Sequence, residues 1–300
     1  MTTDPPPGDA APLATSGTAA GSSATEPARG IPAPRPSGDQ ADVHAGVHAE
    51  GDAEVHAGVR TEVPAATGRP VAEAALLRLG AVAAVLGILI EIAMNFLHPS
   101  KADPNDSAAA FAEYARSGDW QYVHIGQFLG TLLIVLALVA LSRPLSRQPG
   151  LAGALATVGA VTAVLVAAVF AVQMAVDGVA LKGAIDTWTH AASAADRATA
   201  FQVADGIRWV EKSLSSFFHL VNGLTLLTLG LSVALGRGRR RWLGWIGAVS
   251  GVAFLVGAAT VARTGFSAEA DRVLLPGLLL SAVFVLGSAV GMWRGAAREG

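Results

Sequence analysis

The stretch LLRLGAVAAVLGILIEIAMNFL, residues 76–97, decides the fold class of this chain. Its only charged side chains are Arg78, close to the start, and Glu91. A helix needs about 20 mostly apolar residues to cross the hydrocarbon core of a bilayer, which is about 30 Å thick. The stretch therefore predicts a transmembrane helix.

Further apolar stretches of similar length follow along the chain. Together with the first, we expect spans at residues 76–97, 122–141, 151–176, 217–235, 242–261 and 273–293. Of all residues, 52% are hydrophobic and 15% are charged, whereas soluble domains carry closer to about 25% charge. We therefore predict an all-α fold, a polytopic membrane helix bundle of six transmembrane helices over residues 71–300. We therefore expect the lipid bilayer to be one partner of this protein.

The segment before the first span, residues 1–70, has a different composition. It is rich in Pro, Gly, Ala, Ser and Thr, contains no Phe, Trp or Tyr, and carries nine acids against four arginines. Such a segment cannot bury enough apolar surface to offset the entropy lost on ordering, so we predict a disordered N-terminal tail. Its three histidines, His44, His48 and His56, stand in Val-His-Ala repeats, which we interpret as repeat expansion and not as a metal site.

The short connections between spans predict the topology. Residues 142–150 and 236–241 contain six arginines and no acid, so the positive-inside rule makes this side cytoplasmic, with both termini. The opposite side has two longer loops, one with a helix start signal at residues 103–107 and one at 178–208 with a surface helix near 191–203. We interpret both loops as short caps. Eighteen arginines against three lysines are typical of a GC-rich bacterial genome, so we expect a bacterial inner membrane.

Polar residues within the spans are the candidate functional residues, because polar groups at membrane depth usually face a bundle interior or a water-filled cavity. Glu91, Asn95 and His98 are spaced so that they share one helix face. We expect one pocket, in the half of the membrane away from the cytoplasm, formed by Glu91, Asn95, His98, His124, Gln127, Asp177, His219 and Asn222.

Glu91 is the most informative of these residues. It follows Arg78 by 13 positions, which is about 20 Å along a helix. An ionised carboxylate at that depth needs a partner, and the cationic candidates are Lys212, Arg208 and Arg263. The competing interpretation is a structural hydrogen bond or ion pair that holds helices together.

Three classes of function follow from these observations. There is no cysteine, which excludes disulfides and thiolate chemistry, and no Gly-Lys-Ser phosphate loop, His-Glu-x-x-His or Gly-x-Ser-x-Gly motif. The leading interpretation is a non-enzymatic accessory or regulatory protein whose partner is another membrane protein and not a nucleic acid. The first alternative is a small-solute or proton-coupled transporter that uses Glu91.

The second alternative is a metal or haem enzyme. His124 and His219 have similar depths on two spans, as the axial ligands of a haem would. Adding His98 and either Glu91 or Asp177 would make a zinc site instead. The sequence alone assigns neither cofactor.

Residues 76–141 also carry a resemblance to known sequences. The residues concerned are His98-Pro99, Asp103-Pro104-Asn105-Asp106, Phe111, Tyr114-Ala115, Trp120, Val123-His124 and Gln127-Phe128. On these residues the chain resembles a group of uncharacterised bacterial multi-spanning membrane proteins. The resemblance implies a shared membrane fold with an outer first loop. It implies no activity, so no functional residue is transferred.

Overall fold

The computed structural model describes residues 68–238 and 240–299, and every regular element in this part of the chain is a helix. The elements are α1 (Gly68–Leu97), α2 (Ser107–Tyr114), α3 (Trp120–Ser146), α4 (Leu151–Ala175), the π-helical segment η1 (Val176–Leu181), α5 (Lys182–Thr189), α6 (Ala194–Leu235), α7 (Arg241–Thr264) and α8 (Ala268–Glu299). Residues 1–67 lie outside the described residues. The disordered tail and the interpretation of its histidines therefore stay predictions.

Six helical segments are long and apolar enough to cross a membrane. They are Val71–Leu97, Trp120–Ser146, Leu151–Thr189, Ala194–Leu235, Arg241–Thr264 and Ala268–Ala297. Each contains one predicted span, which confirms the all-α, six-span bundle. Large apolar side chains cover their outward faces, among them Leu79, Leu151 and Val161, which are 68%, 64% and 60% exposed. Such an apolar surface is suited to contact with lipid chains. A helix also satisfies its own backbone hydrogen bonds, as a segment in the hydrocarbon core must. The chain is an integral membrane protein.

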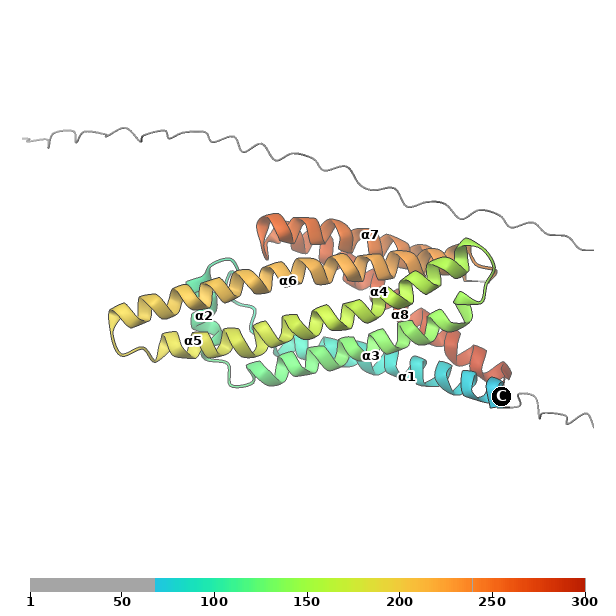
Figure 1. Cartoon of the computed structure of the whole chain (residues 1–300), viewed down its shortest axis with the longest axis horizontal. Helices are drawn as coiled ribbons and strands as arrows, with labels where there is room; N and C mark the ends of the chain where they lie inside the picture. The colour runs from blue at the N-terminus through green and yellow to red at the C-terminus, as the bar shows by residue number, and fades with distance from the viewer. Residues whose placement is uncertain (1–67, 239, 300) are drawn as a thin grey trace, which may run out of the picture. The chain divides into compact units, whose positions relative to one another are not determined.

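The six long helices run side by side along the bundle (Figure 1), and their contacts close into a ring. Each contacts the next one along the chain in the order α1, α3, α4, α6, α7 and α8, and α8 closes the ring against α1. Short connections favour this order, because a short connection leaves consecutive helices as antiparallel neighbours. The start of α1 and the end of α8 lie at one end of the ring, which we call the terminal end.

Close backbone packing joins α6 to α7. A Cβ atom added to Gly230 would lie 2.3 Å from the backbone nitrogen of Ala248, and one added to Gly251 would lie 2.4 Å from that of Leu227. Only glycine fits at such separations, as is common where membrane helices touch. Gly247 of α7 likewise faces a close neighbour, since a Cβ atom added there would lie 2.8 Å from the ring of Phe284.

The end opposite the termini differs from the predicted pair of loops in its second part, residues 178–208. α4 continues through η1 into α5, and α6 begins at Ala194 and runs for 42 residues. At 1.5 Å per residue α6 is about 63 Å long, roughly twice the hydrocarbon thickness. Residues 178–208 therefore form a helical hairpin and not a loop with one surface helix. The length of the apolar run is matched to the hydrocarbon core. The backbone hydrogen bonds of α6 continue beyond that run, so the helix is longer than the span.

The hairpin and α2 form a small cap with its own core. Phe111 of α2 is fully buried, with ring centroids 6.2 Å from Trp188 and 5.7 Å from Phe201. Leu181, Ile185 and Trp188 recur at helical spacing and turn one face of η1 and α5 toward this core. The predicted helix start is confirmed at Asp106, whose side chain accepts a hydrogen bond from the Ala109 amide. We call α2, α5 and the first turns of α6 the cap.

Candidate functional site

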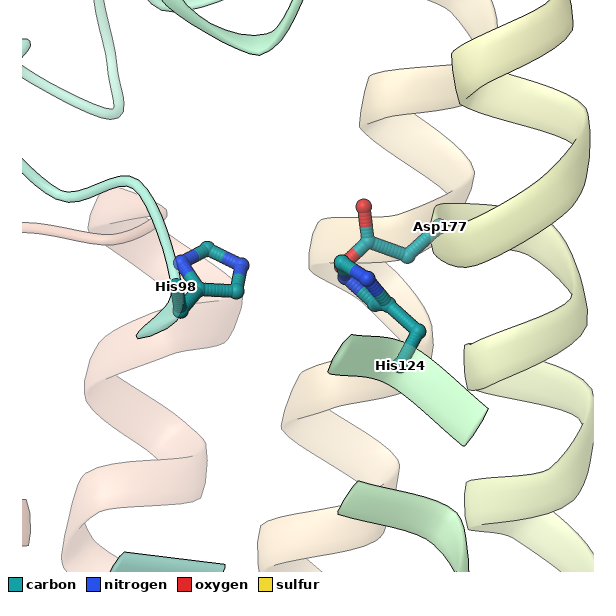
Figure 2. Close-up of side chains that lie close together, drawn as sticks. All are labelled: His98, His124 and Asp177. Carbon is teal, nitrogen blue, oxygen red and sulfur yellow. The ribbon is translucent and has the colours of Figure 1, made fainter. Parts of the chain in front are cut away.

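The predicted polar residues are divided between two places. Glu91, Asn95, Gln127, His219 and Asn222 line a cavity within the bundle. His98, His124 and Asp177 form a separate cluster next to the cap, with ligand atoms within 4.8 Å of one another (Figure 2). We call these places the Glu91 cavity and the His-Asp cluster. A stripe on one helix fixes which residues share a face, but it does not fix which neighbour that face meets.

The Glu91 cavity has a volume of about 750 Å³. Its walls come from the α1, α3, α4, α6, α7 and α8 side chains, and most of them are apolar, such as Ile88, Phe170 and Leu274. The polar lining residues are Glu91, Asn95, Gln127, Thr131, His219, Asn222, Asp271 and Ser281. Ligand cavities in proteins commonly have about 300–1,000 Å³, with apolar walls and a few polar groups, so this space suits a small organic molecule.

The Glu91 carboxyl is held from α3. The Thr131 hydroxyl donates a hydrogen bond of 2.7 Å to Glu91 Oε1, and Gly130 leaves room beside it, since a Cβ there would lie 3.0 Å from the same oxygen. Among the described residues no ion pair joins Glu91 to an expected cation: Arg208 pairs with Glu211, and Lys212 lies over the Trp209 ring. The sequence analysis expected a cation beside this carboxyl and did not predict the Thr131 hydroxyl as its partner.

The buried Nδ1 atom of His219 has no hydrogen-bond partner within the part of the chain that the structure describes. Its ring stacks on Phe254, with centroids 5.7 Å apart, and also contacts Phe218. A buried polar atom without a partner in a native protein calls for an explanation, and a bound ligand is one of the recognised explanations. His219 thus adds a second polar group that can interact with the contents of the cavity.

The His-Asp cluster brings together the ends of three elements. His98 follows α1, His124 lies in the first turns of α3, and Asp177 lies in η1. His124 Nε2 is 3.0 Å from Asp177 Oδ2, and the rings of His98 and His124 have centroids 5.3 Å apart. Figure 2 shows both imidazoles and the carboxyl turned toward a common space.

The π-helical segment η1 positions the cluster. Trp120 Nε1 donates a hydrogen bond of 3.0 Å to the backbone oxygen of Asp177, which ties η1 to the start of α3. A Cβ on Gly178 would lie 2.7 Å from the His124 Cβ, so glycine permits the close approach. Widened turns of this kind are rare within helices and are found frequently at functional sites.

A buried ion pair lies beside the cluster. Arg208 and Glu211 of α6 form it, with side chains 4% and 3% exposed, and the Glu211 carboxyl also interacts with Asp177. Arg208 Nη2 donates to the Tyr114 hydroxyl at 3.2 Å and to the Pro104 backbone oxygen at 3.3 Å. The sequence analysis did not single out Glu211, and it named Tyr114 only among the residues that carry the resemblance, although the i, i+3 spacing of Arg208 and Glu211 is a signal for an ion pair.

Two groups at the border of the cap have shifted pKa values. Burial raises the pKa of Tyr114 to about 12, so its hydroxyl remains protonated at neutral pH. Burial, together with the neighbouring His124, lowers the pKa of His98, so its imidazole is neutral at neutral pH. A neutral imidazole is the form that binds a metal ion.

The haem hypothesis does not fit this arrangement. His124 lies in the His-Asp cluster, whereas His219 lines the Glu91 cavity. The two imidazoles therefore do not face one another across a common space. Similar depth along two helices does not fix the direction in which each side chain points.

No family model, curated protein or solved structure matches the chain. The interpretation of both places therefore depends on their geometry.

Proposed function

We propose that this integral membrane protein binds an amphipathic ligand with a positively charged group in the Glu91 cavity, as a carrier or receptor for such molecules. The observation that supports this proposal is the combination of a cavity of about 750 Å³, apolar walls and the Glu91 carboxyl. The proposal develops the transporter alternative drawn from the sequence. The accessory or regulatory role stays a prediction.

The charge of the lining favours a cation. Glu91 and Asp271 are both acids, and none of the described lining residues is Lys or Arg. An ionised carboxylate within a membrane requires a compensating partner. A ligand cation would supply that partner, and the gain would be large because the surroundings are mostly apolar.

The remaining polar groups suit the polar part of the same ligand. Gln127, Asn222 and His219 offer amide and imidazole hydrogen bonds from α3 and α6. Apolar side chains of α8, including Leu275 and Leu278, would contact the hydrocarbon part. Two or three hydrogen bonds near one charge are enough to orient a ligand whose remaining surface is apolar.

We also propose the orientation that the arginine-rich connections predict, with the terminal end in the cytoplasm of a bacterial cell and the cap outside its inner membrane. A ligand would then meet the cap side first. This orientation concerns the direction of binding and not whether binding occurs.

The experiment is a pair of titrations with matched probes. The full-length protein in nanodiscs is titrated with tetraphenylphosphonium and, separately, with tetraphenylborate, which has nearly the same shape and the opposite charge. We expect at least about tenfold tighter binding of the cation, a difference of about 1.4 kcal/mol. Empty nanodiscs give the background for partition into lipid.

Glu91→Gln should remove the preference for the cation, because the amide keeps the shape and loses the charge. Glu269→Gln is the matched control, since this acid is exposed on α8 and does not line the cavity. Equal binding of both probes to the wild type, or an unchanged preference in Glu91→Gln, would contradict the proposal.

A further inference from the structure

The two histidines of the His-Asp cluster have fixed proton positions. His98 Nδ1 lies 2.8 Å from the backbone oxygen of Pro99, and His124 Nδ1 lies 2.7 Å from that of Trp120. A carbonyl oxygen only accepts hydrogen bonds, so each Nδ1 carries a hydrogen. In the neutral imidazole the lone pair is then on Nε2. Metal-binding histidines are commonly oriented by such a bond from the other ring nitrogen.

The Asp177 carboxyl lies beside the Nε2 lone pair of His124, and its two oxygens have too few hydrogen-bond donors around them. Its Oδ2 is 3.0 Å from His124 Nε2, and with a neutral imidazole both of these atoms are acceptors. Its Oδ1 is buried and has no hydrogen-bond partner among the described residues. The residue itself is only 6% exposed. A proton on His124 would resolve the first contact, but it would leave Oδ1 unpaired.

A metal ion would satisfy all of these groups together. One nitrogen from each histidine and one Asp177 oxygen lie within 4.8 Å of one another. Ligands bound tetrahedrally at about 2.0–2.1 Å from zinc are about 3.3–3.4 Å apart. The His124–Asp177 distance is already close to this value, and modest side-chain rotation would bring His98 into range.

The charges around the cluster also suit a divalent cation. On the η1 and α6 sides, the cluster faces two carboxyl groups, those of Asp177 and Glu211, and one guanidinium, that of Arg208. Arg208 is directed to Glu211, Tyr114 and Pro104, so its charge is largely neutralised. His98 and His124 come from the α1 and α3 sides and are neutral when they bind a metal.

We infer that His98, His124 and Asp177 bind a zinc ion with two imidazole nitrogens and one carboxylate oxygen. Three protein ligands leave one coordination position for water or another small ligand, as in zinc sites that are reactive. The site is independent of the proposed function, because none of its residues lines the Glu91 cavity.

The test measures zinc directly. The full-length chain carries His44→Ala, His48→Ala and His56→Ala, which remove the histidines of the N-terminal segment, and is purified with a peptide tag that has no histidine. After treatment with a chelator, zinc is titrated in competition with a chromophoric chelator, and bound metal is counted by mass spectrometry. We expect one zinc ion per chain, bound with a Kd below about 1 µM.

Two ligand variants and one control complete the test. His98→Ala and Asp177→Ala should each weaken zinc binding at least about 100-fold, the upper end of what even a supporting residue contributes. His190→Ala, an exposed histidine at the end of α5, should leave it unchanged. His98 is only half-buried, so its loss should not prevent folding, and far-UV circular dichroism checks this point.

Cobalt provides a second readout. Substitution of cobalt for zinc should give visible absorption bands of a tetrahedral site in the parent protein, and His98→Ala should lose them. The inference is overturned if the parent binds no zinc at 10 µM, or if folded His98→Ala and Asp177→Ala bind it as tightly as the parent does.

Discussion

The buried ion pair of Arg208 and Glu211 allows a quantitative prediction about how the cap is joined to the bundle. Glu211→Leu removes the carboxylate and leaves the guanidinium, which stays charged in any folded protein. Because the two side chains are 4% and 3% exposed, water cannot compensate for the loss. Removing one partner of a buried pair costs about 3–5 kcal/mol, and we expect a loss of that size.

The double variant Arg208→Met/Glu211→Leu should be less damaging than the single one. It leaves no buried charge and fills the space with apolar side chains. It loses the Arg208 hydrogen bonds to Tyr114 and Pro104, at about 1 kcal/mol each. We therefore expect the double variant to be about 1–3 kcal/mol more stable than Glu211→Leu.

The assay is equilibrium unfolding in mixed micelles with increasing sodium dodecyl sulfate, followed by tryptophan fluorescence and far-UV circular dichroism. Asp186→Leu is the control, because it breaks the partly exposed Lys182–Asp186 pair of α5, where a loss of only about 0–1 kcal/mol is expected. A double variant no more stable than Glu211→Leu would refute this reasoning. So would a neutral Glu211→Leu, which would mean that Arg208 accepts another acid, such as Asp177, at no cost.

Three further predictions concern topology, the cap and the metal. A reporter active only in the cytoplasm should be on when fused after Arg240 and off when inserted at Gly118, and the reverse pattern would invert the proposed orientation. Phe111→Ala removes a fully buried ring at an expected cost of about 3–5 kcal/mol, so it should speed protease cleavage of the cap, whereas Phe217→Ala, 61% exposed on α6, should not. Zinc at 100 times its Kd should stabilise the protein by about 2.7 kcal/mol, measured as a higher Tm that a chelator reverses and that His98→Ala does not show.

Much of the fold could be predicted from the sequence, because the length and hydropathy of one continuous segment are enough to predict a span. The run at residues 76–97 is long and apolar enough to require a membrane whatever its neighbours are. The cap could not be predicted in the same way. Hydropathy falls after Val176, but the backbone continues as a helix through η1 and α5 because Leu181, Ile185 and Trp188 have an apolar face to bury against Phe111.

The candidate sites could be predicted only in part. The i, i+4 spacing of Glu91 and Asn95 correctly placed two residues on one face, and both line the cavity. The rotation of each helix within the ring is set by contacts between distant segments, such as Trp120 with the backbone of Asp177. For that reason His124 and Gln127, three residues apart on α3, belong to different places.

The central claim is that the polar residues of this membrane protein form two independent binding sites, the Glu91 cavity for an organic cation and the His-Asp cluster for zinc. The most direct test measures tetraphenylphosphonium and zinc binding on the same three proteins: the parent, Glu91→Gln and Asp177→Ala. The account predicts that Glu91→Gln loses the preference for the cation and keeps zinc, and that Asp177→Ala does the opposite. Loss of both activities in both folded variants would contradict it, because the residues would then act as a single site.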